Sequence, residues 1–164
     1  MGNNSHRITF EYKFTKEKGF FSFKDRNDVS KLLDIGADFI LRINDGIYFQ
    51  LEDLPILELY RALFEWKKKV KKKKSLESFQ YYTMEHPHEE GAILSLILFD
   101  YKARIHSIWG NANVDNNEFD QTYLVGEFMN LEQQLKNDLE SHFGINVDRY
   151  VKYFPYLNVD INFK

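Results

Sequence analysis

Hydrophobic and polar residues alternate near the start of the chain, which is typical of a half-buried β-strand. The first alternating segment is RITFEYKF, at residues 7–14. A turn at residues 16–19 then leads into a second expected strand, FFSFK, at residues 20–24. Residues 28–36 are expected to form at most a short helical turn that ends at Gly36.

Residues 38–51 (DFILRINDGIYFQL) give the clearest prediction of a β-hairpin. A three-residue loop at 44–46, with Gly46 in the left-handed conformation, would place Ile43 opposite Ile47. A two-residue loop would scatter the apolar residues over both faces, so the three-residue register is predicted. In that register, one face carries Phe39, Leu41, Ile43, Ile47, Phe49 and Leu51.

Apolar residues at helical spacing follow the hairpin and predict the first long helix. Asp53 or Leu54 is expected to cap this helix, and Pro55 would occupy its first turn. The apolar stripe of the helix consists of Ile56, Leu57, Tyr60, Leu63, Phe64 and Val70.

This helix runs directly into the lysine-rich segment at residues 67–74. When the apolar stripe is projected onward, it meets Lys67 and Lys74 at positions that would face the core. Like charges also repel each other at a spacing of four residues. We therefore expect the helix to leave the body of the protein or unwind beyond Trp66, and to fray over residues 70–75.

Three further strands are predicted in the middle of the chain. Residues 79–84 (FQYYTM) form the first of them, and residues 85–91 form the loop that follows. Residues 92–99 (AILSLILF) are apolar on both faces, which indicates a central strand covered on both sides. A turn at residues 100–102 leads to the third strand, at residues 103–109.

The turn at residues 100–102 sets the register of the last two of these strands. It would place Phe99 opposite Ala103 and Ile97 opposite Ile105. The three strands would then form an antiparallel meander, in which the turn at residues 85–91 places Leu96 near Phe79.

The last third of the chain contains the second long helix, whose apolar residues are Phe128, Leu131, Leu135, Leu139 and Phe143. Gly144 is expected to end it. Whether residues 122–126, just before it, form an edge strand or belong to the helix stays open. The other elements expected here are a polar loop at residues 110–120, a short helix at 147–154 that Pro155 ends, and a final strand at 156–163.

These elements predict an α+β fold in a single domain, residues 1–164. The expected architecture is a twisted, mainly antiparallel sheet of about seven to eight strands, with two main amphipathic helices packed on it. Residues 1–6 are expected to be disordered or foreign to the natural chain.

Composition narrows the functional classes. Aromatic residues make up 16% of the chain, and there is no cysteine, which excludes disulfides and cysteine-based zinc sites. The longest apolar stretch, residues 92–99, is too short to span a bilayer, and the start of the chain lacks the apolar run of a secretion signal. We expect a cytoplasmic protein without a membrane partner. Its richness in Lys, Asn, Ile, Phe and Tyr is typical of AT-rich bacterial genomes.

Charge is distributed unevenly along the chain. Residues 1–66 carry a net charge of −2, the lysine-rich segment carries +7, and residues 75–164 carry −8. The protein is therefore an acidic body with one strongly basic segment, and this polarity bears on its partners.

The segment EHPHEE at residues 85–90 is the one candidate metal site in the sequence. Imidazole and carboxylate groups suit zinc, nickel or manganese. The alternative interpretation is a solvated polar loop. In a straight meander His106 would lie roughly 25 Å from the histidine pair, too far to complete a site. The candidate ligands are His86, His88, Glu85 and Glu89, with Glu90 beside them.

No other catalytic pattern is present. The sequence lacks a nucleophile elbow, a phosphate-binding Walker loop and a dinucleotide fingerprint. We therefore expect no catalytic residue and no cofactor, and a protein that is not an enzyme.

Two interpretations of the lysine-rich segment stay open. It is either a solvated helix end or a contact for a polyanion such as nucleic acid. The segment lacks arginine for base recognition, and the acidic body would repel a polyanion that wrapped further. The lysines concerned are Lys67, Lys68, Lys69, Lys71, Lys72, Lys73 and Lys74.

Three segments carry a resemblance in layout. They are the hairpin DFILRINDGIYFQLEDLPILELY (38–60), the strands GAILSLILFDYKARIHSIW (91–109) and the helix FMNLEQQLKNDLESHF (128–143). In this layout the chain resembles small uncharacterised Firmicute proteins encoded beside polymorphic toxins, some of which act as immunity proteins. The resemblance covers most of the chain, carries over no functional residue, and implies that this protein binds another protein.

The leading hypothesis is a non-catalytic protein-binding module, such as an immunity protein, that uses an acidic surface at residues 110–160. A basic protein partner would suit that surface, because complementary charge speeds association. The alternatives are polyanion binding through residues 67–74 and a metal-dependent enzyme at His86 and His88. Unpaired sheet edges, at the first hairpin and the C-terminal strand, would also allow homo-oligomers.

Overall fold

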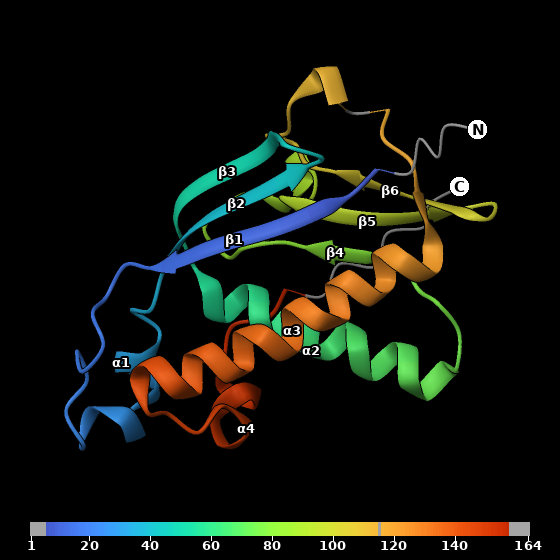
Figure 1. Ribbon diagram of the computed structural model, residues 1–164. Helices are drawn as coiled ribbons and strands as arrows, with labels where there is room; N and C mark the ends of the chain where they lie inside the picture. The colour runs from blue at the N-terminus through green and yellow to red at the C-terminus, as the bar shows by residue number, and fades with distance from the viewer. Residues whose placement is uncertain (1–5, 115, 158–164) are drawn as a thin grey trace.

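Two antiparallel sheets and a layer of helices make up the computed structural model, which describes residues 6–114 and 116–157 (Figure 1). The first sheet has the order β1-β2-β3 and the second has the order β4-β5-β6-β7. The strands are β1 Ile8–Phe14, β2 Ala37–Ile43, β3 Gly46–Leu54, β4 Phe79–Tyr81, β5 Leu94–Phe99, β6 Lys102–His106 and β7 Phe119–Asp120.

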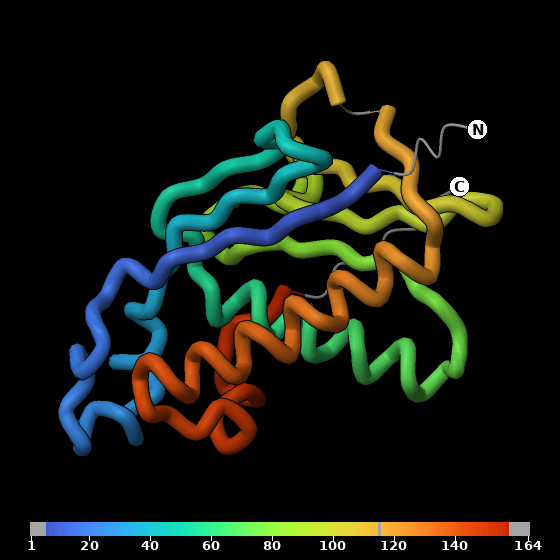
Figure 2. Tube along the Cα trace, in the orientation of Figure 1, coloured from blue at the N-terminus to red at the C-terminus, as the bar shows by residue number. Residues whose placement is uncertain are grey.

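Two long helices, α2 Ile56–Lys73 and α3 Gln121–Phe143, pack against each other on one side of the sheets (Figures 1 and 2). The short helices are α1 Val29–Leu32 and α4 Val147–Tyr150. Four 3₁₀ turns complete the secondary structure: η1 Asp25–Asn27, η2 His88–Glu90, η3 Ala112–Val114 and η4 Val151–Tyr153. The α+β class and the two main helices are confirmed, whereas the strands form two sheets and not one.

The buried side chains of both sheets and of the long helices form one continuous core. Phe128 of α3 lies at its centre. Its ring contacts Phe10 of the first sheet, Phe79 of the second sheet and Trp66 of α2, with ring centroids 5.2, 5.6 and 6.3 Å away. Aromatic rings therefore join the three layers.

The strand predicted at residues 20–24 is wrong. β1 pairs with β2 instead, with Ile8 opposite Ile43, and residues 20–24 form turns and bends. Of this segment only Phe21 is buried, where its ring packs on Phe143 of α3. A single anchoring residue fixes a loop but provides no sheet face.

The predicted hairpin forms, but its turn is shorter than expected. Ile43 pairs with Gly46 across a two-residue turn, and Asn44 takes the left-handed conformation with φ 57°. Asparagine tolerates this conformation. A bulge between Ile47 and Phe49 restores the predicted pairs Leu41↔Phe49 and Phe39↔Leu51.

The residue in that bulge is Tyr48, which is buried although the predicted apolar face omitted it. Its hydroxyl accepts a hydrogen bond from Ser107 N at 3.1 Å, and its carbonyl accepts one from Asn111 N at 2.8 Å. Tyr48 thereby joins the first sheet to the chain that leaves β6. Ile47, which the prediction placed in the core, is exposed.

Neither Asp53 nor Leu54 caps helix α2: Pro55 has a non-helical ψ of 88° and serves as the N-cap, so the helix begins at Ile56. The prediction that the helix leaves the body beyond Trp66 is wrong. It continues without a break to Lys73, and Val70 is only 7% exposed. Lys74 then ends it in the left-handed conformation, with φ 53°.

The β5–β6 hairpin is shifted by one residue from the prediction. Phe99 pairs with Lys102 and Leu98 with Ala103, across a two-residue turn in which Asp100 has φ 49°. β5 is a central strand, as predicted. The prediction that Phe79 lies near Leu96 is also confirmed, because these two residues pair directly.

Residues 122–126 belong to α3, so the edge strand considered there is absent. Asp120 caps the helix by accepting a hydrogen bond from Tyr123 N at 3.0 Å. Gly144 ends it with φ 68°, and α4 with η4 fills the predicted short helix. Most of the predicted final strand, 158–163, and residues 1–5 lie outside the described residues.

Among the residues that the structure describes, no helix is long and apolar enough to cross a membrane.

Candidate functional site

The loop between β4 and β5 surrounds an open hollow of about 400 Å³ on the protein surface. β4 ends at Tyr81, so this loop is longer than the sequence suggested, and the 3₁₀ turn η2 shapes its far side. The residues that line the hollow are Thr83, Met84, Glu85, His86, Pro87, His88 and Leu157.

A buried carboxylate holds the near side of this loop. Glu58, in the first turn of α2, accepts a hydrogen bond from the Thr83 hydroxyl and a longer one of 3.4 Å from Met84 N. Burial raises the pKa of Glu58, and the hydrogen bond from Thr83 opposes that rise. Glu58 therefore fixes the loop to the start of the helix.

The far side of the loop folds back onto the chain that follows β6. The His86 ring lies edge-on to the Trp109 ring, with centroids 4.8 Å apart, and His86 Nε2 lies 2.9 Å from Glu90 Oε2. Gly91 has φ 107° and passes so close to Ile108 that a Cβ atom there would lie 2.8 Å from the Ile108 side chain. Glycine is therefore required for this close approach.

This folding-back corrects the geometry expected from a straight meander. Trp109, which contacts His86, follows His106 by only three residues. The expected separation of roughly 25 Å assumed an extended strand up to the histidine pair. Even so, no three or more His, Cys, Asp or Glu side chains form a group suited to a metal ion within residues 6–114 and 116–157. The second histidine, His88, lies with its Nε2 3.6 Å from Glu89 Oε1.

Exposed apolar and acidic side chains lie in the hollow or next to residues that line it, and we call them together the rim. Met84 is 62% exposed, and Trp109 is 44% exposed beside His86. The carboxylates of the loop, Glu85, Glu89 and Glu90, are all exposed as well. The rim therefore combines apolar contact area with negative charge.

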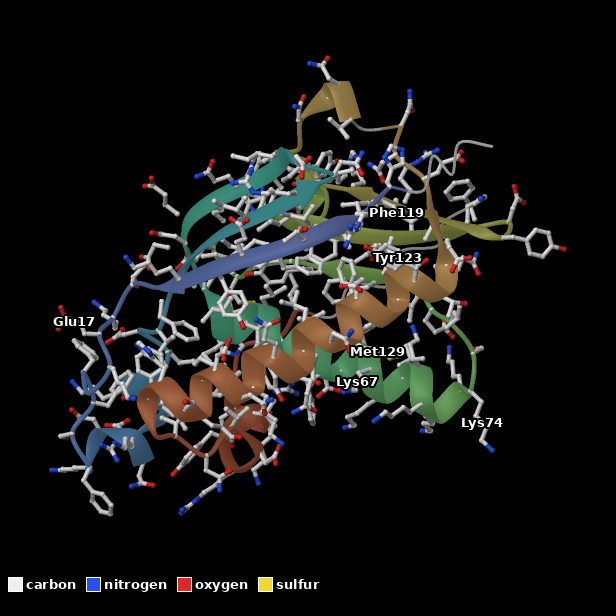
Figure 3. All side chains as sticks on the ribbon, viewed as in Figure 1. Glu17, Lys67, Lys74, Phe119, Tyr123 and Met129 are labelled. Carbon is white, nitrogen blue, oxygen red and sulfur yellow. The ribbon has the colours of Figure 1, made fainter. Side chains whose placement is uncertain are left out.

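The lysine-rich segment lies far along α2, at its C-terminal end (Figure 3). Lys67 is largely buried against α3, where its Nζ donates to Glu132 Oε2 at 2.9 Å. Beyond it, only Val70 faces the core. The other lysines from Lys68 to Lys74 are exposed to solvent.

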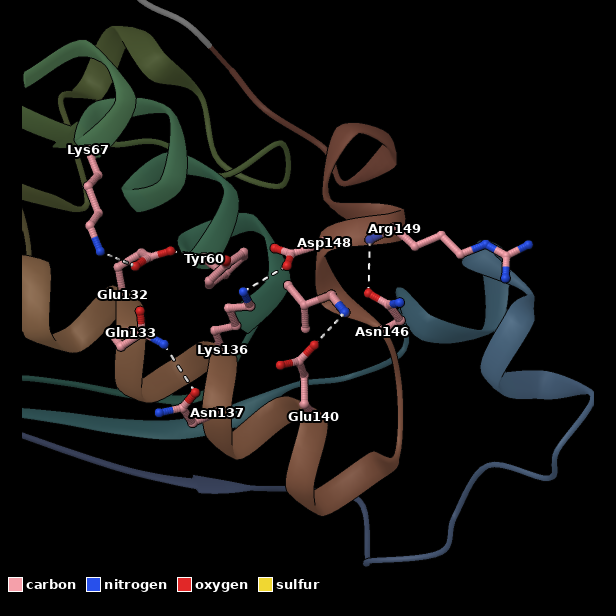
Figure 4. A network of polar contacts seen from close by, with 11 residues as sticks. Tyr60, Lys67, Glu132, Gln133, Lys136, Asn137, Glu140, Asn146, Asp148 and Arg149 are labelled. Atoms are coloured by element: carbon pink, nitrogen blue, oxygen red, sulfur yellow. Dashed lines mark hydrogen bonds and ion pairs between the residues drawn. The ribbon is translucent and has the colours of Figure 1, made fainter. Parts of the chain in front are cut away.

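Most of the described acidic side chains at residues 110–160 take part in contacts within the protein, and Figure 4 shows those of Glu132, Glu140 and Asp148. Asp120 caps α3, and Asp138 accepts a hydrogen bond from the Tyr12 hydroxyl, which raises the pKa of Tyr12 together with burial. The remaining contacts are Glu132 with Tyr60 and Lys67, Glu140 with Val147 N, and Asp148 with Lys136. Within the described part of the chain, Glu118 and Glu127 have no such contact.

One family model, described as "Domain of unknown function (DUF7878)", matches residues 10–141. The chain belongs to this family. No curated protein and no solved structure matches the chain. The DUF7878 region includes the loop around the hollow, Trp109 and the lysine-rich segment, whereas Leu157 lies beyond it.

Sequence reasoning found His86 and His88 but missed Glu58, Thr83, Met84 and Trp109. One pattern could have drawn attention to Glu58, because it is a carboxylate within the otherwise apolar stretch ILELY. Trp109 was assigned to the end of a strand, and its contact with His86 depends on a fold-back that local pattern does not encode.

Proposed function

We propose that the protein is a non-catalytic protein-binding module and that the hollow beside Trp109 is its contact surface. One observation carries this proposal: exposed Met84 lines an open hollow of about 400 Å³, and exposed Trp109 contacts His86, which also lines it. Aromatic residues and methionine are enriched in the centres of protein interfaces, and exposed apolar area beside a hollow is typical of them.

The proposed partner presents a basic segment. Glu85, Glu89 and Glu90 are exposed on the same loop as Met84. Their carboxylates would receive Lys or Arg side chains, whose methylene stems would pack on Met84 and Trp109. This places the contact at residues 83–90 and Trp109. The acidic side chains at residues 110–160 are less available to a partner, because most of those that the structure describes bind groups within the protein.

An immunity protein is one role that such a module would serve. A basic nuclease toxin would match the acidic rim, and charge complementarity would speed the encounter. This finer proposal rests on the layout that the chain shares with such proteins and on the charge of the rim.

The test compares three forms of the purified protein as baits in extracts of the source cells. They are the natural chain, the M84S/W109S variant and a control, Y101S, in which Tyr101 at the β5–β6 turn is 90% exposed. A partner that binds the natural chain and the control, but not M84S/W109S, supports the proposal. Equal retention by all three forms, or no partner retained by the natural chain, contradicts it.

The charge of the partner gives a second readout. Replacing Glu85, Glu89 and Glu90 by Gln should weaken the binding of the same partner. Raising the salt concentration should weaken the binding of that partner to the natural chain. A partner that is acidic, or whose binding these changes leave untouched, would contradict the proposed basic contact.

A further inference from the structure

The exposed end of α2 carries positively charged side chains that do not line the hollow. An α-helix turns by about 100° per residue, so the direction of each side chain follows from its number. Trp66 and Val70 mark the buried side of this segment. Opposite them, within about 160° of the helix circumference, lie four residues that we call the outward lysines: Lys68, Lys69, Lys71 and Lys72.

Two other lysines flank the buried side and are held by carboxylates. Lys67 Nζ lies 2.9 Å from Glu132 Oε2, and Lys73 Nζ lies 3.4 Å from Glu77 Oε1. These pairs neutralise the two lysines nearest the core. Together with buried Val70, they help to keep the helix regular as far as Lys73.

The ammonium groups of the outward lysines have few acidic neighbours among the residues that the structure describes. Within the residues described, Lys68 has one ion pair, to Glu65 at 3.9 Å, and it also lies over the Phe64 ring at 5.4 Å. An exposed pair at that distance contributes little. In the described ranges, 6–114 and 116–157, the other three outward lysines have no acidic partner.

We propose that the outward lysines bind the phosphate backbone of double-stranded DNA without reading its sequence. Lysine binds phosphate as a point charge, and a regular helix presents the four ammonium groups in a fixed array. The helix diameter of about 10–12 Å also matches the major groove of about 12 Å. The absence of arginine from the array removes the usual bidentate contact to guanine.

Other polyanions fit this end of α2 less well. Among the described residues near the outward lysines, Trp66 is buried and the partly buried Phe64 ring already lies under Lys68, so stacking on the bases of a single strand is disfavoured. The deep, narrow major groove of RNA duplexes does not admit a helix. Insertion into a bilayer requires an exposed apolar face, and the apolar face of α2 is buried in the core, so only electrostatic attraction to anionic headgroups would remain.

The number of available lysines sets the expected salt dependence. Four phosphate contacts give a slope of log affinity against log salt of about −4, whereas all seven lysines would give about −6. The net charge of −10 on the rest of the protein opposes any wider contact. The affinity should therefore fall about a hundredfold between about 50 and 200 mM salt.

The experiment measures fluorescence anisotropy of a labelled, random-sequence DNA duplex with the purified chain across that salt range. The variant K68Q/K69Q/K71Q/K72Q should lose the binding, with a slope close to zero. A matched control, K13Q/K18Q/K24Q/K31Q, changes the net charge equally at four exposed lysines elsewhere, and it should keep both the affinity and the slope. Thermal unfolding should show both variants folded.

Several results would overturn the proposal: no measurable duplex binding, equal loss in both variants, or a slope unchanged in the outward-lysine variant. Tighter binding to a single-stranded oligonucleotide, to an RNA duplex or to vesicles containing phosphatidylserine would assign the array to that ligand instead. The array shares no residue with the hollow, so this test and the test of protein binding succeed or fail separately.

Discussion

Lys67 Nζ of α2 lies 2.9 Å from Glu132 Oε2 of α3, at the position where the apolar stripe of α2 meets its lysines. The hydroxyl of Tyr60 donates to the other oxygen of the same carboxylate, at 3.0 Å. Glu132 is nearly buried, so its carboxylate receives two donors from α2 within the helix interface (Figure 4). This contact holds the lysine-bearing part of α2 on the core.

Replacing Lys67 by Ala should lower the free energy of unfolding by about 2–3 kcal/mol, because Glu132 would keep a buried charge with only Tyr60 as a donor. Loss of one partner from a fully buried pair costs about 3–5 kcal/mol, and the partial exposure of Lys67 reduces that cost. Urea denaturation measures the change. K69A, on the exposed side of the same helix, should stay within about 0.5 kcal/mol of the natural chain; equal effects of the two substitutions would contradict this role for Lys67.

The end of α2 should be protected from hydrogen exchange as far as Lys73. Val70 anchors it, so V70A should cost about 1.5–2.5 kcal/mol and open the amides of residues 70–73. Exchange measured by mass spectrometry on a peptide covering residues 66–74 tests both statements. Unprotected exchange of these amides in the natural chain would instead support the fraying expected from sequence.

Elements with strong local sequence patterns were predictable. The contacts that these elements make with distant parts of the chain were less predictable. The predictions of Leu96 near Phe79, of the long helix up to Gly144 and of the core of the first hairpin were all correct. The end of α2 was misjudged because the residue that neutralises Lys67 is Glu132, which lies 65 positions away in the sequence.

The errors in register have a similar origin. The bulge at Tyr48 exists because the hydroxyl of this residue reaches Ser107, beyond the end of the second sheet. The sequence did not predict the hollow for the same reason, because the contact between His86 and Trp109 joins a loop to the chain after β6. Periodicity describes single elements and carries no information about such contacts between them.

Gly110 should not tolerate a side chain. A Cβ atom there would lie 2.4 Å from Cζ of Tyr48, so G110A should destabilise the protein by about 1–3 kcal/mol as the ring is displaced. G126A is the matched control in α3, where nothing lies within 4 Å of the added atom. Alanine favours a helix interior, so G126A should raise stability by about 0.5–1 kcal/mol. Thermal unfolding gives both values, and a neutral G110A would argue against the Tyr48 contact.

Glu58 should make the stability of the protein depend on pH. Because burial raises the pKa of Glu58 above its ordinary value of 4.5, the native state binds this proton more tightly than the unfolded state. Its contribution is therefore most favourable below pH 4.5 and is lost as the pH rises through the native pKa. The free energy of unfolding of E58Q, relative to the natural chain, should rise over that interval.

Urea denaturation at several pH values between about 4 and 8 measures this difference. The control is E52Q, which removes an exposed carboxylate of β3. The same pH trend in both variants would show that Glu58 is not the source.

Site-specific crosslinking tests protein binding at the hollow most directly. A photoreactive amino acid is placed at Met84, or at Tyr101 as a control, in the full chain within the source cells. We expect one discrete protein adduct from position 84, which is absent from position 101 and is weakened when Glu85, Glu89 and Glu90 are replaced by Gln. No adduct from position 84, or the same adducts from both positions, would contradict it.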